Sequence, residues 1–410
     1  MKIVVFADMF LPHVDGVTNS LVHLIKAFEK EGHEVFVVAP KLKGSDKVKL
    51  KGIKIVYLPS IPAMVYPELM LGLFSRELFR ELRKFSPEIV HVIGPGPVGS
   101  IGLFYSKLAG IKSTAAFHGY FMEPEYLKLI GIKNHGVEIA QKMLWMLVKS
   151  FYDRADLVIT PSQFVKQDLL DHDFSREIVV INNAIDFSNV KLDKGKQKEF
   201  IKKFELEKSK VVLNVGRVSG EKNIELLIQS FTKVSKACPN SKLLIVGNGP
   251  ELDNLKQLSI SLGLEKFVVF AGEIKNKDLV KKGIFKLAKV FVTTSNSEVQ
   301  PVSVIEAMSF GLPIVAAKSR GLTEMVSDNG YLADGNNADE FSQKILKILL
   351  DDNLQKEMSK KSMQISKQYS ISSSAKKHLD HYKKLNNQNL EKKNSKKGTV
   401  KSFIKSQLSR

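Results

Sequence analysis

The sequence predicts an α/β protein with two domains, each built on a parallel β-sheet. Within residues 3–39 an apolar segment, a loop, a helix-like segment and a second apolar segment follow one another, and the same order begins again at residue 211. A strand, a helix and a second strand in this order form a βαβ unit, which favours parallel pairing. The length of 410 residues also suits two such domains better than one.

The composition is that of a folded, basic protein. Hydrophobic residues make up 43% of the chain, enough for two cores. The formal net charge of +19 favours an anionic partner: nucleotide phosphates, a membrane surface or nucleic acid. No recognisable nucleic-acid motif accompanies this charge, so we do not expect nucleic acid. The single cysteine, the lack of a bilayer-spanning apolar run and the short apolar run at the N-terminus predict a cytoplasmic protein.

Residues 1–190 are expected to form the first domain. A strand at residues 3–7 leads into a loop that contains Gly16, and a helix follows at residues 19–31 with apolar residues at helical spacing. Further strands are expected at residues 34–39, 88–93, 113–117, 156–162 and 178–186. The strand at residues 113–117 ends at His118, although a lone histidine is more often structural than functional.

A glycine-rich segment at residues 94–99 matches the pattern G-x-G-x-x-G of dinucleotide-binding loops. We reject that interpretation for two reasons. The segment follows a later strand rather than the first one. In addition, Pro95 and Pro97 remove two backbone donors that a pyrophosphate would need. The segment is therefore expected to be a loop that opens a helix at residues 100–108.

Residues 191–368 are expected to form the second domain. A turn at residues 216–223 places Arg217 and Lys222 between a strand and a helix. Two cations near a helix start would neutralise a diphosphate leaving group, although two unrelated charges on a surface loop are the structural alternative. A second glycine turn, Gly247-Asn248-Gly249, follows the strand that begins at residue 243.

The segment at residues 297–313 carries two carboxylates, Glu298 and Glu306, eight positions apart. Pro301 suits the first turn of a short helix, and Gly311 is a stop signal. Glu298 then lies in the loop at the carboxyl end of a strand, where ligands bind in open α/β sheets. Glu306 lies inside the helix, whose free N–H groups form an anion site. The spacing alone is more typical of solvated surface charges.

This segment resembles the E-x7-E motif of retaining glycosyltransferases of family four, which have the GT-B fold. The likeness includes Glu306-Ala307-Met308 and Gly311-Leu312-Pro313, and residues 216–222 are similar to the family's G-R-x-x-x-x-K motif. The resemblance covers about residues 1–385. It implies two Rossmann-like domains that face each other across a cleft, and a helix at residues 369–385 that crosses back to the first domain.

The resemblance also implies roles for single residues. Arg217 and Lys222 would grip the donor diphosphate, Glu306 would bind the ribose, and Glu298 would bind sugar hydroxyls. His118 would touch the donor sugar from the first domain. The implied catalytic residues are His118, Arg217, Lys222 and Glu298. The implied donor-binding residues are Gly16, Gly216, Arg217, Lys222, Gly247, Asn248, Gly249, Glu298, Val302 and Glu306. We expect no catalytic metal and no cofactor, because no D-x-D-type site is evident and the UDP-sugar is a substrate.

Two basic segments bear on the acceptor. Arg76, Arg80, Arg83 and Lys84 recur at helical spacing after an apolar stretch, as in a helix that lies at a membrane interface. A surface helix that packs on the domain core is the more ordinary alternative. The tail at residues 386–410 is also basic, and we expect it to be disordered, with contact to anionic lipid as the alternative.

We therefore expect a retaining enzyme that transfers a hexose, in the first place glucose, from a UDP-sugar to a membrane lipid. The N-terminal loop and residues 118–120 resemble diacylglycerol glucosyltransferases, so diacylglycerol is the expected acceptor. The protein would be peripheral on the cytoplasmic face of an anionic membrane. Three alternatives stay open: a cytosolic transferase with a glycan or small-molecule acceptor, a GT-B UDP-sugar epimerase, and a non-catalytic lipid-binding module. The lipid-binding module would tolerate the loss of Glu298 and Glu306, whereas a transferase would not.

Overall fold

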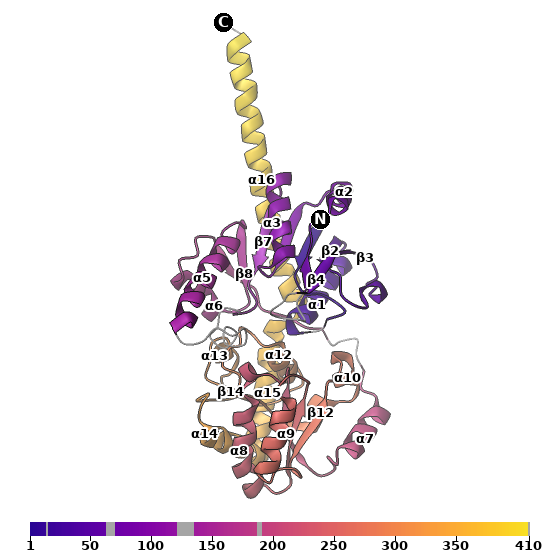
Figure 1. Cartoon of the computed structure of the whole chain (residues 1–410), viewed down its shortest axis with the longest axis vertical. Helices are drawn as coiled ribbons and strands as arrows, with labels where there is room; N and C mark the ends of the chain where they lie inside the picture. Colours follow the sequence, from indigo (N-terminus) through magenta and orange to yellow (C-terminus); the bar gives the residue numbers. More distant parts are fainter. Residues whose placement is uncertain (14, 63–69, 121–134, 187–190, 409–410) are drawn as a thin grey trace.

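The structure, a computed structural model, describes all residues except 14, 63–69, 121–134, 187–190 and 409–410. Two parallel β-sheets with helices packed around them form two domains, one above the other along the long axis of the molecule (Figure 1). Alternate residues of the first strand are buried in two different cores, one on each face of the sheet. Burial on both faces explains why these strands are continuous apolar runs.

The first domain contains a seven-stranded sheet with the order β3-β2-β1-β6-β7-β8-β9. Every neighbouring pair in it is parallel. The strands are β1 (Lys2–Ala7), β2 (Glu34–Pro40), β3 (Ile53–Leu58), β6 (Ile89–Ile93), β7 (Lys112–Ala116), β8 (Leu157–Thr160) and β9 (Ile178–Val180). A separate antiparallel pair joins β4 (Ser60–Pro62) to β5 (Met70–Gly72).

Several helices of the first domain begin at a side-chain cap or at a proline. The helices of this domain are α1 (Gly16–Lys30), η1 (Ser45–Lys47), α2 (Arg76–Phe85), α3 (Pro97–Ala109), α5 (His135–Tyr152) and α6 (Gln163–Asp171). Helix α1 starts three residues earlier than expected because Asp15 accepts a hydrogen bond of 2.6 Å from the Thr18 N–H and caps it. Helix α3 likewise starts earlier, at Pro97, a residue that suits a first helical position.

The second domain contains a six-stranded parallel sheet with the order β12-β11-β10-β13-β14-β15. The strands are β10 (Lys210–Val215), β11 (Ser241–Val246), β12 (Val268–Gly272), β13 (Ala288–Thr293), β14 (Ile314–Ala317) and β15 (Gly330–Ala333). The helices are α7 (Lys194–Lys203), η2 (Gly220–Lys222), α8 (Ile224–Ala237), α9 (Leu252–Ser261), α10 (Asn276–Lys281), α11 (Ile284–Leu287), α12 (Val302–Ser309), α13 (Leu322–Met325), α14 (Ala338–Leu350), α15 (Asp352–Ser366) and η3 (Lys367–Tyr369).

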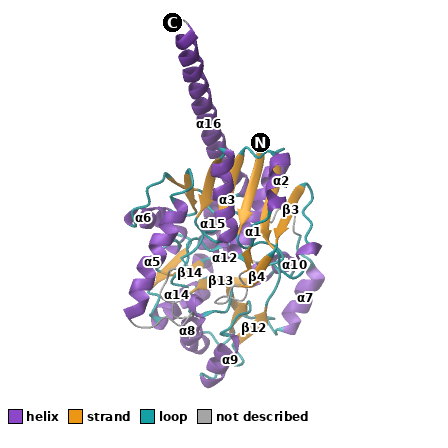
Figure 2. Cartoon of the chain, turned by 45° about the horizontal axis from the view of Figure 1, so that its top comes forward, coloured by secondary structure: helices purple, strands orange, loops and turns teal. Residues whose placement is uncertain are grey.

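The last helix, α16 (Ile371–Leu408), crosses from the second domain to the first and then projects beyond it (Figures 1 and 2). Ala375, Leu379 and Tyr382 are buried in the core of the first domain. The sequence predicts a disordered tail from residue 386, whereas in the structure the helix continues without a break to Leu408. The segment has no proline, and lysine and glutamine are good helix formers, so the sequence permits this continuation.

The glycine-rich segment after β6 binds a carboxylate of the protein itself. The side chain of Asp8, at the end of β1, accepts hydrogen bonds from the N–H groups of Gly96 (2.9 Å), Val98 (2.8 Å) and Gly99 (3.2 Å). Burial raises the pKa of Asp8 to about 7, and the three N–H groups act in the opposite direction. The amides that a pyrophosphate would need are therefore already occupied, which accounts for the pattern without a dinucleotide.

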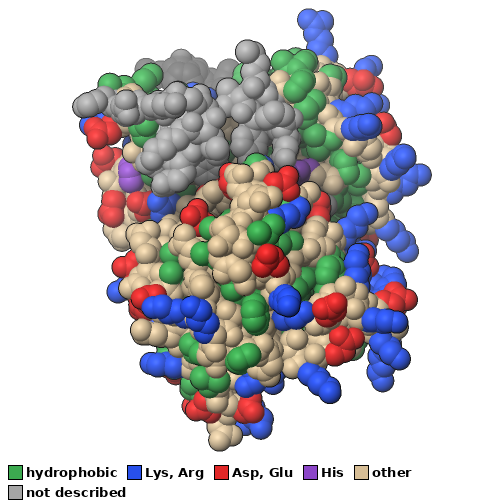
Figure 3. All heavy atoms as spheres, turned by 60° about the horizontal axis from the view of Figure 1, so that its bottom comes forward, with side chains coloured by type: hydrophobic (Ala, Val, Ile, Leu, Met, Phe, Trp, Pro, Cys, Tyr) green, Lys and Arg blue, Asp and Glu red, His purple; other side chains and the backbone are tan. Residues whose placement is uncertain are grey.

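The charges are distributed unevenly. On the face shown in Figure 3, basic and acidic side chains are interspersed over the second domain. On helix α2 of the first domain, by contrast, Arg76, Arg80, Arg83 and Lys84 are all exposed. In both ribbon views α2 lies toward the end of the molecule from which α16 projects, away from the second domain (Figures 1 and 2). The helix also carries Glu77 and Glu81, so an anionic surface would meet a net positive charge at α2 rather than a uniform one.

Candidate functional site

The two domains meet where the N-terminus of α1 faces the N-terminus of α12. A Cβ atom at Gly16 would lie 3.6 Å from the Cβ atom of Val302, so two residues of the predicted donor site are neighbours from different domains. Gly16 follows β1 and Val302 follows β13, so both lie at the carboxyl ends of parallel strands. In α/β folds this edge is where ligands bind.

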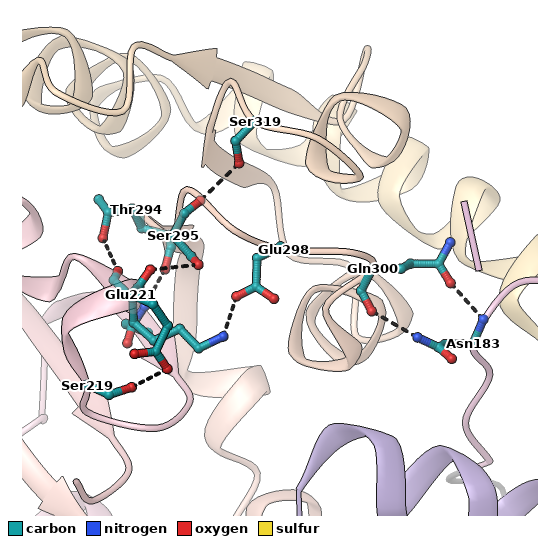
Figure 4. Close-up of polar contacts among 11 residues, drawn as sticks. Asn183, Ser219, Glu221, Thr294, Ser295, Glu298, Gln300 and Ser319 are labelled. Carbon is teal, nitrogen blue, oxygen red and sulfur yellow. Dashed lines mark hydrogen bonds and ion pairs between the residues drawn. The ribbon is translucent and has the colours of Figure 1, made fainter. Parts of the chain in front are cut away.

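An ion pair joins two of the predicted catalytic residues. The Nζ atom of Lys222 lies 2.6 Å from Oε1 of Glu298, and Figure 4 shows the contact. The two side chains are only 28% and 13% exposed. Burial lowers the pKa of Lys222, but the attraction of Glu298 and Glu221 outweighs it, and the pKa is raised overall. Lys222 is therefore a cation held in a fixed direction by a carboxylate.

Hydroxyl groups at the end of β13 hold the Lys222 loop in place (Figure 4). Thr294 Oγ1 donates to the carbonyl of Lys222 (3.1 Å), and Ser295 Oγ donates to the carbonyl of Glu221 (3.1 Å). Ser319 Oγ in turn donates to the carbonyl of Ser295 (3.1 Å). The backbone of Lys222 is thus fixed to the strand end from which the chain continues to Glu298.

The two glycine turns of the second domain pack backbone against backbone. The N–H of Val218 donates to the carbonyl of Asn248 (2.9 Å). A Cβ atom at Gly247 would lie 1.8 Å from the carbonyl oxygen of Gly216, and one at Gly249 would lie 2.1 Å from the carbonyl oxygen of Val218. Only glycine allows so close an approach. The predicted residues Gly216, Gly247 and Gly249 therefore form one surface.

Arg217 lies on that surface and is exposed. Its positive charge is close enough to Lys222 to lower the pKa of the lysine, a smaller effect than the attraction of Glu298. Two cations beside backbone loops at a strand end can hold a dianion such as a diphosphate. The structure thus brings together the cations that the sequence places five positions apart.

Glu306 is 2% exposed, in the middle of α12. Burial raises the pKa of this carboxyl from 4.5 to about 8. At neutral pH the group is therefore mostly protonated, and a protonated carboxyl can both donate and accept a hydrogen bond. This property suits the recognition of a hydroxyl pair, which also donates and accepts.

The raised pKa of Glu306 predicts a dependence of stability on pH. The folded state binds this proton more tightly than the unfolded state, so the contribution is complete below pH 4.5 and is lost as the pH rises through about 8. Glu306→Gln is expected to flatten the decline by at most about 1.4 kcal/mol per pH unit. Urea denaturation of both proteins at several pH values measures the difference. Asp8 contributes a decline of the same sign in both proteins, so equal slopes would contradict the prediction for Glu306.

His118 lies two residues beyond β7, at the edge that faces the second domain. Burial lowers its pKa to about 4, and the nearby charge of Asp15 acts in the opposite direction. The Nδ1 atom is buried and has no hydrogen-bond partner among the residues that the structure describes. His118 is thus a neutral imidazole near the start of α1, and its contact with a sugar stays a prediction.

Further contacts between the domains have no signal in the sequence. Glu324 of α13 accepts hydrogen bonds from the N–H groups of Gln163 (3.0 Å) and Phe164, and so caps α6 of the other domain. The guanidinium of Arg320 lies 4.2 Å from the ring centre of Tyr120. Each pair joins residues more than 150 positions apart, so only the folded chain reveals it.

The fold and the site together define a class of enzyme. Two Rossmann-like domains that meet at charged loops are the GT-B architecture of glycosyltransferases. Residues 14–189 match the family model described as Glycosyltransferase Family 4, and residues 196–364 match the model described as Glycosyl transferases group 1. Each domain thus matches a glycosyltransferase family model, and the two matches together span most of the chain.

Known proteins of several activities are similar to this chain. Alpha-monoglucosyldiacylglycerol synthase of Streptococcus pneumoniae is 28% identical over 337 residues, which span 81% of this chain and 74% of that protein. GDP-mannose-dependent alpha-mannosyltransferase of Mycolicibacterium smegmatis is 27% identical over 82% of this chain and 84% of its own length. The crystal structure of Anabaena HepE in complex with UDP superposes with a TM-score of 0.73 over 94% of this chain and all of that one, at 18% identity. This last likeness shows the fold alone.

Proposed function

We propose that the protein transfers a hexose, in the first place glucose, from a UDP-sugar to a membrane lipid such as diacylglycerol, with retention at the anomeric carbon. The observation that carries the transfer is the ion pair between Lys222 and Glu298 with Arg217 beside it. A nucleoside diphosphate is a leaving group that needs two cations in this position. The name of the similar Streptococcus pneumoniae enzyme supports the lipid acceptor.

The proposed reaction exchanges one bond at the anomeric carbon. The bond from that carbon to the β-phosphate oxygen breaks, and a bond to the acceptor hydroxyl oxygen forms on the same face. Arg217 and Lys222 neutralise the charge that develops on the diphosphate, and Glu298 orients Lys222 and binds sugar hydroxyls. The hydroxyl proton passes to the leaving phosphate, so no enzyme nucleophile is required. Each contact that strengthens in the transition state contributes a few kcal/mol.

The surface around α2 supports a membrane-bound acceptor. Leu78 and Leu82 are buried, so the apolar face of α2 itself packs on the domain core. Exposed apolar side chains lie beside it, however: Phe74 is 59% exposed and Phe104 of α3 is 57% exposed. Phe79 joins them, with ring centres 4.9 Å from Phe74 and 6.4 Å from Phe104. Exposed aromatic rings next to arginines suit the interface of an anionic membrane.

None of the helices in the described part of the chain combines the length and the apolar character needed to cross a bilayer.

Reversing charge on α2 is expected to weaken membrane binding. Arg80→Glu with Arg83→Glu should reduce binding to phosphatidylglycerol vesicles by about tenfold or more, because each basic residue near the surface contributes about 1 kcal/mol. Lys236→Glu with Lys266→Glu changes the net charge equally at exposed positions of the second domain and is the matched control. Co-sedimentation at two salt concentrations measures the effect. Equal losses in both double variants would show that only net charge matters.

One experiment tests the whole proposal. The purified protein is incubated with UDP- and GDP-hexoses and with vesicles that contain or lack diacylglycerol, and the lipids are analysed by mass spectrometry. We expect a glycolipid that requires a UDP-hexose and diacylglycerol and that disappears with Glu306→Ala. Transfer only to a soluble glycan would exclude a lipid as the acceptor. Isomerisation of the UDP-sugar in the absence of an acceptor would show that the protein is an epimerase rather than a transferase.

A second candidate is a mannosyltransferase that uses GDP-mannose. The similarity to the Mycolicibacterium smegmatis mannosyltransferase, at 27% identity, is the observation that favours it. The same donor panel separates the two candidates, because only one nucleotide-sugar should be consumed at a substantial rate.

A further inference from the structure

Gln300 lies between the two predicted donor carboxylates in sequence, but its side chain points at the junction between the domains (Figure 4). It is 5% exposed. The amide oxygen accepts a hydrogen bond from the N–H of Asn183 (2.7 Å), and the amide nitrogen donates to the carbonyl of Pro161 (2.8 Å). The side chain of Asn183 in turn donates to the carbonyl of Gln300 (3.1 Å). One residue of the second domain is thus bonded to two separate segments of the first.

The segment that Gln300 contacts is itself a meeting point. Ser374 of α16 donates to the carbonyl of Asn182 (3.1 Å). Ser20 of α1 contacts the carbonyl and the N–H of Ala184, each at 3.3 Å. Residues 182–184 therefore connect α1, α16 and the loop before α12, just before the chain enters the second domain. A rotation of one domain relative to the other would therefore have to break or rearrange these hydrogen bonds.

The position of Gln300 in its loop gives these contacts a consequence. Glu298 lies two residues before it, and Val302, which faces Gly16, lies two residues after it. Fixing the amide of Gln300 at both ends therefore fixes the loop that carries Glu298 relative to the first domain. By contrast, Arg217 and Glu306 belong to the second domain alone, and the backbone of Lys222 is held within that domain by Thr294.

We propose that Gln300 is a positioning residue for glycosyl transfer. Its amide links the domain junction to the loop that carries Glu298. The Glu298 side chain is thereby held in the correct direction relative to the first domain, which is the acceptor side. This inference rests on the proposed role of Glu298, but not on the identity of the sugar or of the acceptor. It predicts that loss of the amide slows transfer and leaves the affinity for the free nucleotide unchanged.

The test compares Gln300→Ala with Gln229→Ala, which removes an exposed glutamine of α8. UDP-glucose with diacylglycerol vesicles measures transfer, and calorimetry with UDP and GDP measures nucleotide affinity. For Gln300→Ala we expect kcat to fall by about tenfold or more, because misplacement of a reacting group by about 1 Å has effects of this size or larger. The dissociation constant of the nucleotide should change by less than about twofold, and Gln229→Ala should resemble the unaltered protein.

A second variant separates positioning from loss of structure. Gln300→Glu keeps the acceptor for the Asn183 N–H but places a carboxylate oxygen opposite the carbonyl of Pro161. A buried carboxyl has a raised pKa, and its protonated form can donate to that carbonyl. The rate of this variant relative to the unaltered protein should therefore rise several-fold from about pH 8 to about pH 6. A flat ratio, or a parallel loss of transfer and nucleotide affinity, would overturn the proposal.

Amide hydrogen exchange provides a readout that does not depend on the substrate. In Gln300→Ala the amides of residues 181–185 and 298–302 should exchange faster together, while β10 and β11 stay protected. Unchanged exchange in both segments would refute the coupling. If the unaltered protein transfers no sugar, the proposed function fails, but this measurement still decides whether Gln300 couples the two segments.

Discussion

Glu298→Gln is expected to lower kcat by about two to three orders of magnitude, the typical effect of losing one oriented charge contact in an active site. The amide that replaces the carboxylate has no charge, so the 2.6 Å ion pair with Lys222 is lost. Lys222 is only 28% exposed and would keep Glu221 as its remaining neighbouring carboxylate. Both the direction of the ammonium group and its charge should then be less well defined. Steady-state kinetics measures the effect, with the nucleotide-sugar that the donor panel selects.

The control for this substitution is Glu265→Gln, at an exposed position of the same domain. It removes the same charge and should leave kcat within about twofold of the unaltered protein. Thermal unfolding of both variants shows whether they fold. A folded Glu298→Gln protein with nearly normal kcat would exclude Glu298 from the chemistry and would leave the ion pair as a structural contact.

Gly247→Ala should destabilise the second domain by about 3 kcal/mol or more, a size typical of severe steric conflict. The new Cβ atom would lie 1.8 Å from the carbonyl oxygen of Gly216, which is backbone and cannot rotate away. Gly247 also has a backbone φ angle of +153°, which residues other than glycine rarely adopt. We expect a lower midpoint in chemical denaturation and a loss of nucleotide binding, because the two turns can no longer touch.

Gly216→Ala is the matched control on the other side of the same contact. Within the described part of the chain, no atom outside the adjacent residues lies within 4 Å of the position that its Cβ would take, so the stability should change by less than about 1 kcal/mol. Similar losses of stability in the two variants would show that the close approach of the turns is not what constrains these glycines.

Sequence reasoning was most successful where the signal is local. The apolar runs predicted most strands of the two sheets, although not β3 or β15. The paired motifs around Lys222 and Glu298 led to the GT-B fold that the comparisons confirm. The predicted helix starts were less accurate. The capping of α1 by Asp15 and the place of Pro97 at the first position of α3 both depend on local backbone geometry. The sequence predicts a disordered tail from residue 386, whereas the helix in the structure continues through Gly398 to Leu408, because charge and one glycine are weak guides to where a helix ends.

The contacts inside the site were largely beyond the sequence. Lys222 and Glu298 were assigned to different parts of the donor, but they bind each other although they lie 76 positions apart in the sequence. Gln300 gave no signal, since a glutamine between two strong motifs resembles a surface residue until its amide is placed against Asn183 and Pro161. Asp8 likewise reveals its function only when the glycine segment folds around it. Each of these contacts joins residues that are far apart in the sequence, so no periodic sequence pattern announces it.

The crossing of α16 has a consequence for how the protein is made. Ile3, Val5 and Phe28 share a core with Leu379 and Tyr382, which are synthesised after the whole second domain. Because the chain emerges from the ribosome N-terminus first, the whole second domain is synthesised before this face of the first domain's sheet is covered. During that interval the first domain exposes an apolar surface. A protein ended after residue 190 should therefore aggregate rather than fold as an independent domain.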